Sequence, residues 1–515
     1  MQNNKPSLWF ALFAWGAIIL RWGYHYGTGD QVELLPYTLF LHDHSLYAKD
    51  FFIQGLNASI PNERTVMASL LLPFLSHLEF FCFLFYALST VALVMGLEKL
   101  ARRFVENKYV AWLAVLITLV PLNDYTLGNV DLTPDTLQAG TVAVAIIVWA
   151  INLFLDKKLV WSAVLMSIAT FIQLLDGLDV MMVLCAILFI ELLRKGIGWK
   201  QFLTFTGLYA LTAGIYLCFI LLQKTASGNE AASHTLTADA FFQTLFVFRH
   251  PHHFIFQTFP WFKTLVFFSL SLIGLLFFMA RSAKLFQFML IGLLGIIAYA
   301  VIVDCFHLVA IGNFQFYKVT QWMKFFGVLG ALEALRLAVF SGTRRLGEIR
   351  FEKTLLAIGT IACFACILFC RQYLPYKVPY QLFALKEEDD MIAICEKIKD
   401  VTPQDALFIQ PFDNTELKFY GQRSSFVEFK ANVRHKRFVG EWLYRIGLIY
   451  NVGLNSDVKG FALQQLADKT FYSLGAAKLE ELKGLGVTHL LTRKEAKPPI
   501  GELILANDTY AVYKL

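Results

Sequence analysis

Long apolar runs alternate with short polar loops through roughly the first 370 residues of the chain. A hydrocarbon core about 30 Å thick requires roughly 20 apolar residues in each helix that crosses it. About eleven runs approach that length, so the pattern predicts an all-α polytopic membrane domain over residues 1–371. The predicted spans cover residues 8–26, 78–97, 110–122, 136–155, 160–175, 180–193, 202–222, 262–280, 285–303, 322–340 and 354–370.

Two stretches near the N-terminus need separate treatment. The first apolar run follows a single cation, Lys5, and no small-residue cleavage pattern comes after it, so we interpret it as a retained helix and not as a removed signal peptide. The stretch 64–75 is amphipathic and contains Pro73. It lies either in the membrane interface or at the start of the second span, and we leave it unassigned.

Beyond residue 371 the hydrophobicity falls and shorter amphipathic patterns replace the long runs. Residues 372–515 are therefore predicted to form a soluble, extracytoplasmic α/β domain at the C-terminus. Helices are expected at 384–399, 438–450 and 476–485, and strands at 406–410, 425–429, 489–492 and 510–514.

The composition agrees with a chain that is largely dissolved in lipid. Of its 515 residues 57% are hydrophobic and only 16% are charged, and 49 are Phe, which excludes an ordinary soluble protein. The net charge of +6 comes mainly from short loops, with no basic tail or aromatic-interleaved patch, so we expect no nucleic-acid partner. Eight Cys are present, but the predicted soluble domain holds only Cys395, so no disulfide framework is implied.

The charges of the loops predict an orientation. Lys and Arg gather in the loops 98–108, 156–158, 194–200, 281–284 and 341–353, whereas the alternate loops carry Asp and most of the His. Because basic loops stay in the cytoplasm, this pattern places the N-terminus inside and the C-terminal domain outside. We expect a multi-pass protein of the cell inner membrane with a periplasmic C-terminal domain.

The first outer loop carries the sharpest local signal. Asp30 follows a turn with two glycines, Gly27 and Gly29, directly after the first span, and Glu33 comes one helical turn later. Partial desolvation at the membrane boundary suits a carboxylate to general-base work. The alternative is that Asp30 only caps a helix over residues 31–41. Further along, a surface loop is the favoured reading of His42, Asp43, His44 and Asp50, with metal binding as the rival.

The next two outer loops add further acids. Asp124 and Asp131 lie in the second loop, where Pro134 is expected to open the following helix with Asp131 or Thr133 as its cap. Asp176 lies in a short turn, 173–179, that sets it at the same membrane face. Asp50, Asp124 and Asp176 are candidate acceptor-binding or supporting residues, and Asp131 is a candidate catalytic acid.

The fourth outer segment contains a cationic cluster. Arg249, His252 and His253, with His250, form a group flanked by aromatic residues that can bind a phosphate headgroup. Interfacial anchoring and zinc binding are the alternatives, but Pro251 interrupts helical spacing and no Cys accompanies the histidines. Lys318, in the loop after the ninth span, offers a second cation on this side. Few charged residues lie inside the spans, which argues against an ion-driven transporter.

This layout resembles the GT-C superfamily of polytopic glycosyltransferases, which use lipid-phosphate-linked sugars at the outer face of the membrane. In that family an acidic residue of the first outer loop acts as base, and Asp30 in Gly29-Asp30-Gln31-Val32-Glu33 occupies that place. The chain is still more similar to a set of uncharacterised bacterial GT-C-like proteins. They share Gly29-Asp30-Gln31, Arg249 with Pro251-His252-His253, and Arg423 with Phe429-Lys430.

The resemblance implies transfer of a hexose or pentose from a polyprenyl-phosphate donor to a glycan, lipid or protein acceptor. It assigns the catalytic role to Asp30, Glu33 and Asp131, and donor-phosphate binding to Arg249, His252, His253 and Lys318. Because no clean three-ligand metal set is visible, we expect a metal-independent inverting transfer without a cofactor. The alternative is a non-catalytic protein that binds, assembles or transports lipid-linked glycans.

Overall fold

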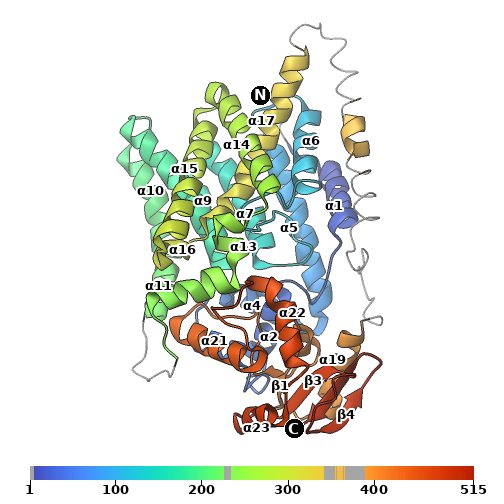
Figure 1. The fold of residues 1–515 in the computed structure, drawn as a ribbon. Helices are drawn as coiled ribbons and strands as arrows, with labels where there is room; N and C mark the ends of the chain where they lie inside the picture. Colours follow the sequence, from blue (N-terminus) through green and yellow to red (C-terminus); the bar gives the residue numbers. More distant parts are fainter. Residues whose placement is uncertain (1–4, 226–233, 341–353, 355, 363–364, 366–388) are drawn as a thin grey trace. The chain divides into compact units, whose positions relative to one another are not determined.

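The structure, a computed structural model, describes residues 5–225, 234–340, 354, 356–362, 365 and 389–515. It divides into two compact units (Figure 1). The first unit comprises residues 1–26, 79–218 and 252–382, and the second comprises residues 27–78, 219–251 and 383–515. The predicted domain boundary at residue 371 and eight of the seventeen residues of the predicted span 354–370 lie outside the described residues.

The first unit is built from helices. Every predicted span before residue 341 corresponds to helical structure. The helices are α1 (Leu8–Trp22), α5 (Leu78–Ala101), α6 (Lys108–Leu119), α7 (Ala139–Leu155), α8 (Leu159–Ile172), α9 (Leu174–Leu193), α10 (Trp199–Tyr209), α11 (Ile215–Thr225), α13 (Pro251–Phe254), α14 (Trp261–Arg281), α15 (Ala283–Phe306), α16 (Val309–Gly312) and α17 (Thr320–Phe340). A π-helical turn, Ala210–Gly214, joins α10 to α11.

Four helices are long and apolar enough to cross a membrane: Thr65–Ala101, Trp199–Ile220, Trp261–Arg281 and Ala283–Phe306. The first of them contains the unassigned stretch 64–75, which is helical from Thr65 and continues into α5. Other predicted spans are short apolar helices, such as α6 with 12 residues. The structure thus supports a largely helical chain with several candidate spans, and about eleven crossings stay a prediction.

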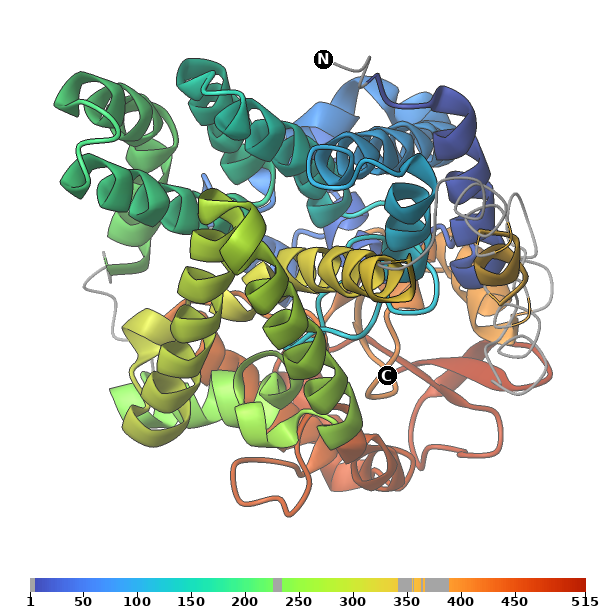
Figure 2. The ribbon, with the colours of Figure 1, turned by 90° about the horizontal axis from the view of Figure 1, so that it is seen from above.

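Glycines bring α14 and α17 close together, and the view from above shows α14 beside both α17 and α15 (Figure 2). A Cβ atom added at Gly327 would lie 2.6 Å from the carbonyl oxygen of Leu270, and one added at Gly274 would lie 2.8 Å from the Cα of Gly327. Small residues that let two backbones approach are a common device of helix packing in membranes.

The second unit combines three separate parts of the chain. Its helices are α2 (Gln31–His42), α3 (Phe51–Asn57), α4 (Thr65–Leu71), α12 (Ala238–Phe242), α19 (Asp390–Val401), α20 (Glu416–Tyr420), α21 (Lys436–Tyr450), α22 (Gln464–Phe471) and α23 (Ala476–Gly484), with a π-helical segment at Gln243–Arg249. Its strands are β1 (Leu407–Ile409), β2 (Ser424–Ser425), β3 (His489–Arg493), β4 (Glu502–Ala506) and β5 (Tyr510–Lys514).

The strands form one sheet in the order β2-β1-β3-β5-β4. β1 runs parallel to β2 and β3, whereas β5 is antiparallel to β3 and β4. The helices expected at 438–450 and 476–485 and the strands expected at 406–410, 489–492 and 510–514 are confirmed. The expected strand 425–429 is wrong beyond Ser425, because residues 426–429 leave the sheet to enter the core, and β4 and α22 were not predicted.

An aromatic core holds this unit together. Trp442 of α21 is fully buried between Phe248 and Phe429, and its indole N–H donates to the carbonyl of Glu428 at 2.9 Å. Phe412 stacks on Phe429 with their ring centroids 4.2 Å apart. The indole keeps its hydrogen bond while its rings leave water, which is the usual condition for burying Trp.

The contact between α14 and α17 generates a first prediction. Gly327→Ala should lower the melting temperature of the purified protein in detergent, since overpacking a tight contact costs about 1–3 kcal/mol. Gly207→Ala in α10 is the matched control, because a Cβ at Gly207 meets nothing within 4 Å. Equal melting temperatures for the two variants would refute the close approach.

Candidate functional site

The turn before α2 leaves the Asp30 carboxylate unused by the helix. Asp30 occupies the N-cap position of α2, yet its side chain makes no capping hydrogen bond. Gly27 and Gly29 both have positive φ, +73° and +57°, and the Gly27 N–H donates to the Gln31 side chain at 2.7 Å. Asp30 is exposed, so the partial desolvation expected from its place in the sequence is not supplied by the fold.

Glu33 lies one turn into α2 and is buried in an ion pair. Its carboxylate accepts a hydrogen bond from Arg64, whose guanidinium also bonds Glu63 at 3.0 Å. Burial alone lowers the pKa of Arg64, but Glu33, Glu63 and Asp30 more than offset this, so that the pKa lies above its ordinary value. Arg64 is thus held as a permanent cation beside the Asp30 turn.

Arg249, at the end of the π-helical segment, is the most unusual cation of this unit. Its side chain is among the largest fully buried ones, and its guanidinium carbon lies 4.6 Å from the ring centroid of Phe429 and 5.0 Å from that of Phe461. Nη2 donates to the carbonyl of Lys430 at 2.7 Å. Nε and Nη1 have no hydrogen-bond partner among the described residues.

The electrostatics of Arg249 match this geometry. Burial lowers its pKa to about 9, and the negative charge of Glu33 opposes that shift. Glu33 itself is committed to Arg64, so Arg249 carries a buried charge that no hydrogen-bonded acid among the described residues neutralises. A buried charge without a partner is costly, and an anionic ligand would remove the cost.

Lys430 links Arg249 to the Asp30 turn. Its ammonium donates a hydrogen bond to the carbonyl oxygen of Gly29, the residue before Asp30, while its own carbonyl accepts from Arg249. Asp30, Glu33, Arg64, Arg249 and Lys430 therefore form one charged group within the second unit, which we call the Arg249 cluster.

Asp50 belongs to a separate and closed ionic group. It is fully buried and caps α3, with one carboxylate oxygen accepting from the Ile53 N–H at 2.9 Å and the other from the Ser425 N–H at 2.8 Å. Lys418 lies 3.5 Å from Asp50 and 2.8 Å from Glu428. Asp50 thus has a supporting role in the fold, and its expected place in a surface loop is wrong, whereas His42, Asp43 and His44 are exposed.

In the first unit the acids of the second predicted loop are also engaged. Asp124 pairs with Lys263 at 2.6 Å. Burial raises the pKa of Asp131 to about 6, although Lys324 acts in the opposite direction. The next helix, α7, begins at Ala139 with Gln138 as its cap, so the expected start at Pro134 with Asp131 or Thr133 as cap is wrong. Asn123 exchanges two hydrogen bonds with the Thr133 backbone, which holds this loop in a non-helical conformation.

Asp176 and Lys318 form a pair in the first unit. Asp176 is not in a turn, as expected, but in the first turn of α9, where it is buried and bonded by Lys318 at 3.0 Å and Gln321 at 3.4 Å. Lys318, predicted to bind donor phosphate, therefore has an acid as its partner. Asp179 is fully buried, and neither of its carboxylate oxygens accepts a hydrogen bond from the described part of the chain.

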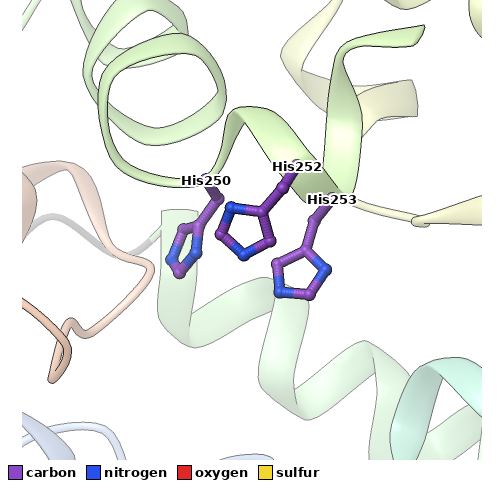
Figure 3. Close-up of side chains that lie close together, drawn as sticks. All are labelled: His250, His252 and His253. Carbon is purple, nitrogen blue, oxygen red and sulfur yellow. The ribbon is translucent and has the colours of Figure 1, made fainter. Parts of the chain in front are cut away.

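The three histidines after Arg249 come together locally, although Pro251 interrupts their helical spacing. The chain bends at His250, between the π-helical segment and α13, so that the imidazoles of His250, His252 and His253 lie side by side (Figure 3). One ligand nitrogen from each lies within 4.8 Å of the others, and His253 Nδ1 is 2.7 Å from the carbonyl oxygen of Gly128. Three imidazoles suit a divalent transition metal, so the metal alternative stays open.

The comparisons with known proteins bear on one part of the second unit. Residues 389–449 match a family described as a domain of unknown function (DUF6798). This segment carries α19, β1, α20, β2 and most of α21, and with them Lys418, Glu428 and Lys430. No curated protein matches the chain.

Sequence reasoning found Asp30, Glu33 and Arg249 but missed their partners. Arg64 stands at the start of an amphipathic stretch, and its pairing with Glu33 has no signature in local spacing. Lys430 was named as part of a shared motif but not as a partner of Gly29 or Arg249, and Lys418 and Glu428 were not singled out. One signal could have revealed Lys418, Glu428 and Lys430. Each is one of the two charged residues in an otherwise apolar or uncharged stretch, in Glu416–Tyr420 or in 424–431.

The Lys418 group yields a stability prediction. Lys418→Met would leave Asp50 and Glu428 buried without their cation, so we expect a loss of about 3–5 kcal/mol and a large fall in melting temperature. Lys483→Met, at an exposed lysine of α23, should leave the melting temperature unchanged. The double variant Lys418→Met/Glu428→Gln should recover part of the loss, and a Lys418→Met protein as stable as wild type would exclude the ionic role.

Glu428 also predicts a pH dependence. Burial raises its pKa from 4.5 to about 7, although Lys418 lowers it. The folded chain therefore binds this proton up to a higher pH than the unfolded chain, and the contribution to stability falls as pH rises from about 4.5 to 7. The melting temperature of wild type minus that of Glu428→Gln should decline across this window and level off above it. A difference that increases with pH would contradict the assignment.

Proposed function

We propose that this chain is an integral membrane glycosyltransferase that moves a sugar from a polyprenyl-phosphate donor to an acceptor at the extracytoplasmic face. The observation that carries the proposal is Arg249, whose buried guanidinium keeps Nε and Nη1 without a partner among the described residues. Nε and Nη1 are separate donors on different edges of the guanidinium, and each can donate a hydrogen bond to an oxygen of an anion such as a phosphate.

The surroundings of Arg249 favour a phosphate over a neutral ligand. Phe429 and Phe461 fix the plane of the guanidinium, so little side-chain entropy is left to lose on binding. A dry, cationic site of this kind stabilises the charge that develops on a departing phosphate.

In the proposed reaction Asp30 accepts the proton of an acceptor hydroxyl, and the oxygen of that hydroxyl forms a bond to the anomeric carbon of the donor sugar. The bond from that carbon to the phosphate oxygen breaks, and its electron pair leaves with the polyprenyl phosphate. Arg249 binds the phosphate and Glu33 holds Arg64 in place. The scheme needs no redox step and no cofactor.

The other residues predicted from the sequence fall into two groups, those still expected to contact substrates and those that support the fold. The donor contacts of His252 and His253 and the role of Asp131 as a second acid stay predictions from the sequence. Asp124, Asp176 and Lys318 already have ion-pair partners, and we assign them to the support of the fold. The partners in this scheme are membrane lipid, the lipid-linked sugar and a glycan, lipid or protein acceptor, and no nucleic acid.

The membrane arrangement is part of the proposal. About eleven crossings, with the shorter helices spanning a locally thinned bilayer, place the basic loops in the cytoplasm and the C-terminal α/β domain in the periplasm of a cell with an inner membrane. The four candidate spans support a membrane protein by their length and composition. The first loop, with Asp30, then faces the same side as the C-terminal domain.

A second function, binding of a lipid-linked glycan without catalysis, is favoured by one specific observation. Asp30 is exposed, and the neighbouring Glu33 is already paired with Arg64, so neither acid is a desolvated base in the unliganded chain. A binding, assembly or transport protein would use Arg249 in the same way. It would need no base.

Turnover of a panel of polyprenyl-phosphate sugars in nanodiscs tests the proposal. Wild type should release polyprenyl phosphate, and Asp30→Asn should lower kcat by about 100-fold or more with donor binding retained, because general-base catalysis contributes that much. Arg249→Lys should instead weaken donor binding, since a lysine ammonium cannot place donors at the positions of both Nε and Nη1. Asp508→Asn, at an exposed aspartate, is the control.

Two results would decide against a transferase. If folded wild type binds the donors but releases no polyprenyl phosphate with any acceptor tried, the chain is a binding protein. If Asp30→Asn turns over at the wild-type rate, Asp30 is not the base.

A further inference from the structure

We propose that Lys430 is a positioning residue that fixes both the Asp30 turn and Arg249, so that the segment 389–449 serves to assemble the site. The inference rests on the proposed function, because it takes Asp30 as the base and Arg249 as the residue that binds the phosphate. It gives a role to the part of the chain that matches a domain of unknown function.

The first contact acts on the base. The Lys430 ammonium donates to the carbonyl oxygen of Gly29, the peptide group that leads directly into Asp30. Gly29 has a φ of +57°, and across the same turn the Gly27 N–H donates to the Gln31 side chain. Since the Asp30 carboxylate makes no capping bond to α2, the orientation of this peptide decides where the carboxylate points.

The second contact acts on Arg249, the residue proposed to bind the phosphate. The Lys430 carbonyl accepts from Arg249 Nη2 at 2.7 Å, and the ring of the preceding residue, Phe429, lies against the guanidinium. One contact uses Nη2 and the other uses the face of the guanidinium, and Nε and Nη1 have no partner among the described residues. A single residue therefore connects, through its side chain and its main chain, the two groups that the reaction needs at a fixed separation.

A third contact comes from the same segment. The Asp30 turn begins at Gly27, where an added Cβ would lie 2.5 Å from a ring carbon of Phe419 and 2.6 Å from the Tyr420 hydroxyl. The segment thus holds the turn at both ends, at Gly27 by close packing and at Gly29 by the ammonium of Lys430. Misplacing a reacting group by about 1 Å can cost about 100-fold in rate.

Lys430→Met and Lys430→Arg test this role in full-length protein in nanodiscs. Lys430→Met keeps the stem and the carbonyl that holds Arg249 but removes the ammonium. We expect kcat to fall about 10- to 100-fold with the donor KM changed less than about threefold, because Arg249, which binds the donor phosphate in this scheme, stays in place. Lys430→Arg should restore most of kcat, and Lys483→Met, at an exposed lysine, should match wild type.

Hydrogen exchange of the peptide 27–34 supplies a readout that needs no turnover. Lys430→Met should exchange faster than wild type in this peptide, whereas Lys430→Arg and Lys483→Met should not, because only the first loses the bond to Gly29. Unchanged exchange in Lys430→Met would overturn the inference. So would a loss of donor affinity that equals the loss of kcat, since Lys430 would then contact the donor itself.

The two proposals fail in different ways. If wild type neither binds nor turns over any polyprenyl-phosphate sugar, the proposed function fails, while faster exchange of 27–34 in Lys430→Met still supports the positioning contact. If wild type is active and Lys430→Met keeps the wild-type kcat, the positioning role fails and the transferase stands.

Discussion

The burial of charge in the second unit is the constraint on which its organisation depends. Lys418 lies between two buried carboxylates, Asp50 from the first polar loop and Glu428 from the C-terminal part of the chain. Asp50 also caps α3 and accepts from the Ser425 backbone, and the Tyr47 hydroxyl donates to the Lys418 carbonyl. These polar groups are satisfied only when both parts of the chain fold together, so neither the loop 27–78 nor the segment 389–449 can be treated as an independent module.

The contrast between the Lys418 group and the Arg249 cluster separates structural from functional charge. Lys418 bonds two acids, and the Asp50 oxygens are both used, so this group is complete without a ligand. Arg249 is equally buried but bonds only a carbonyl, and its nearest acid is paired elsewhere. This difference between a closed ionic group and a buried cation with unpaired N–H groups is the observation on which the proposed anion site rests.

The sequence predicted local structure better than it predicted partnerships. Apolar periodicity located the helices before residue 341 and most elements of the C-terminal part, because those patterns are read within a single element. It failed where a local signal competed with a distant contact. Proline often occupies the first turn of a helix, but the loop beside Pro134 is held in another conformation by the hydrogen bonds of Asn123. Asp176 was expected in a turn, but it lies in a helix, where it forms a buried ion pair with Lys318.

The same limit applied to the candidate site. Asp30, Glu33 and Arg249 stand in recognisable motifs, whereas Arg64 and Lys430 acquire meaning only through pairing across the fold. The shared motifs Gly29-Asp30-Gln31, Arg249 and Phe429-Lys430 nevertheless converge in the second unit, through the Lys430 bond to Gly29 and the Arg249 contacts to Phe429 and Lys430. Arg423 of the same motif bonds the carbonyls at the end of α19 and is structural.

The exposure of Asp30 sets a condition on any catalysis at this site. An exposed carboxylate is a weak base, and here the fold does not remove water from it. Under the proposed function the desolvation would come from the ligands, with the donor phosphate at Arg249 and the acceptor over the turn. Such a site would be inactive toward water while empty and would acquire its base only when both substrates are bound. That property suits an enzyme whose donor would otherwise be lost to hydrolysis.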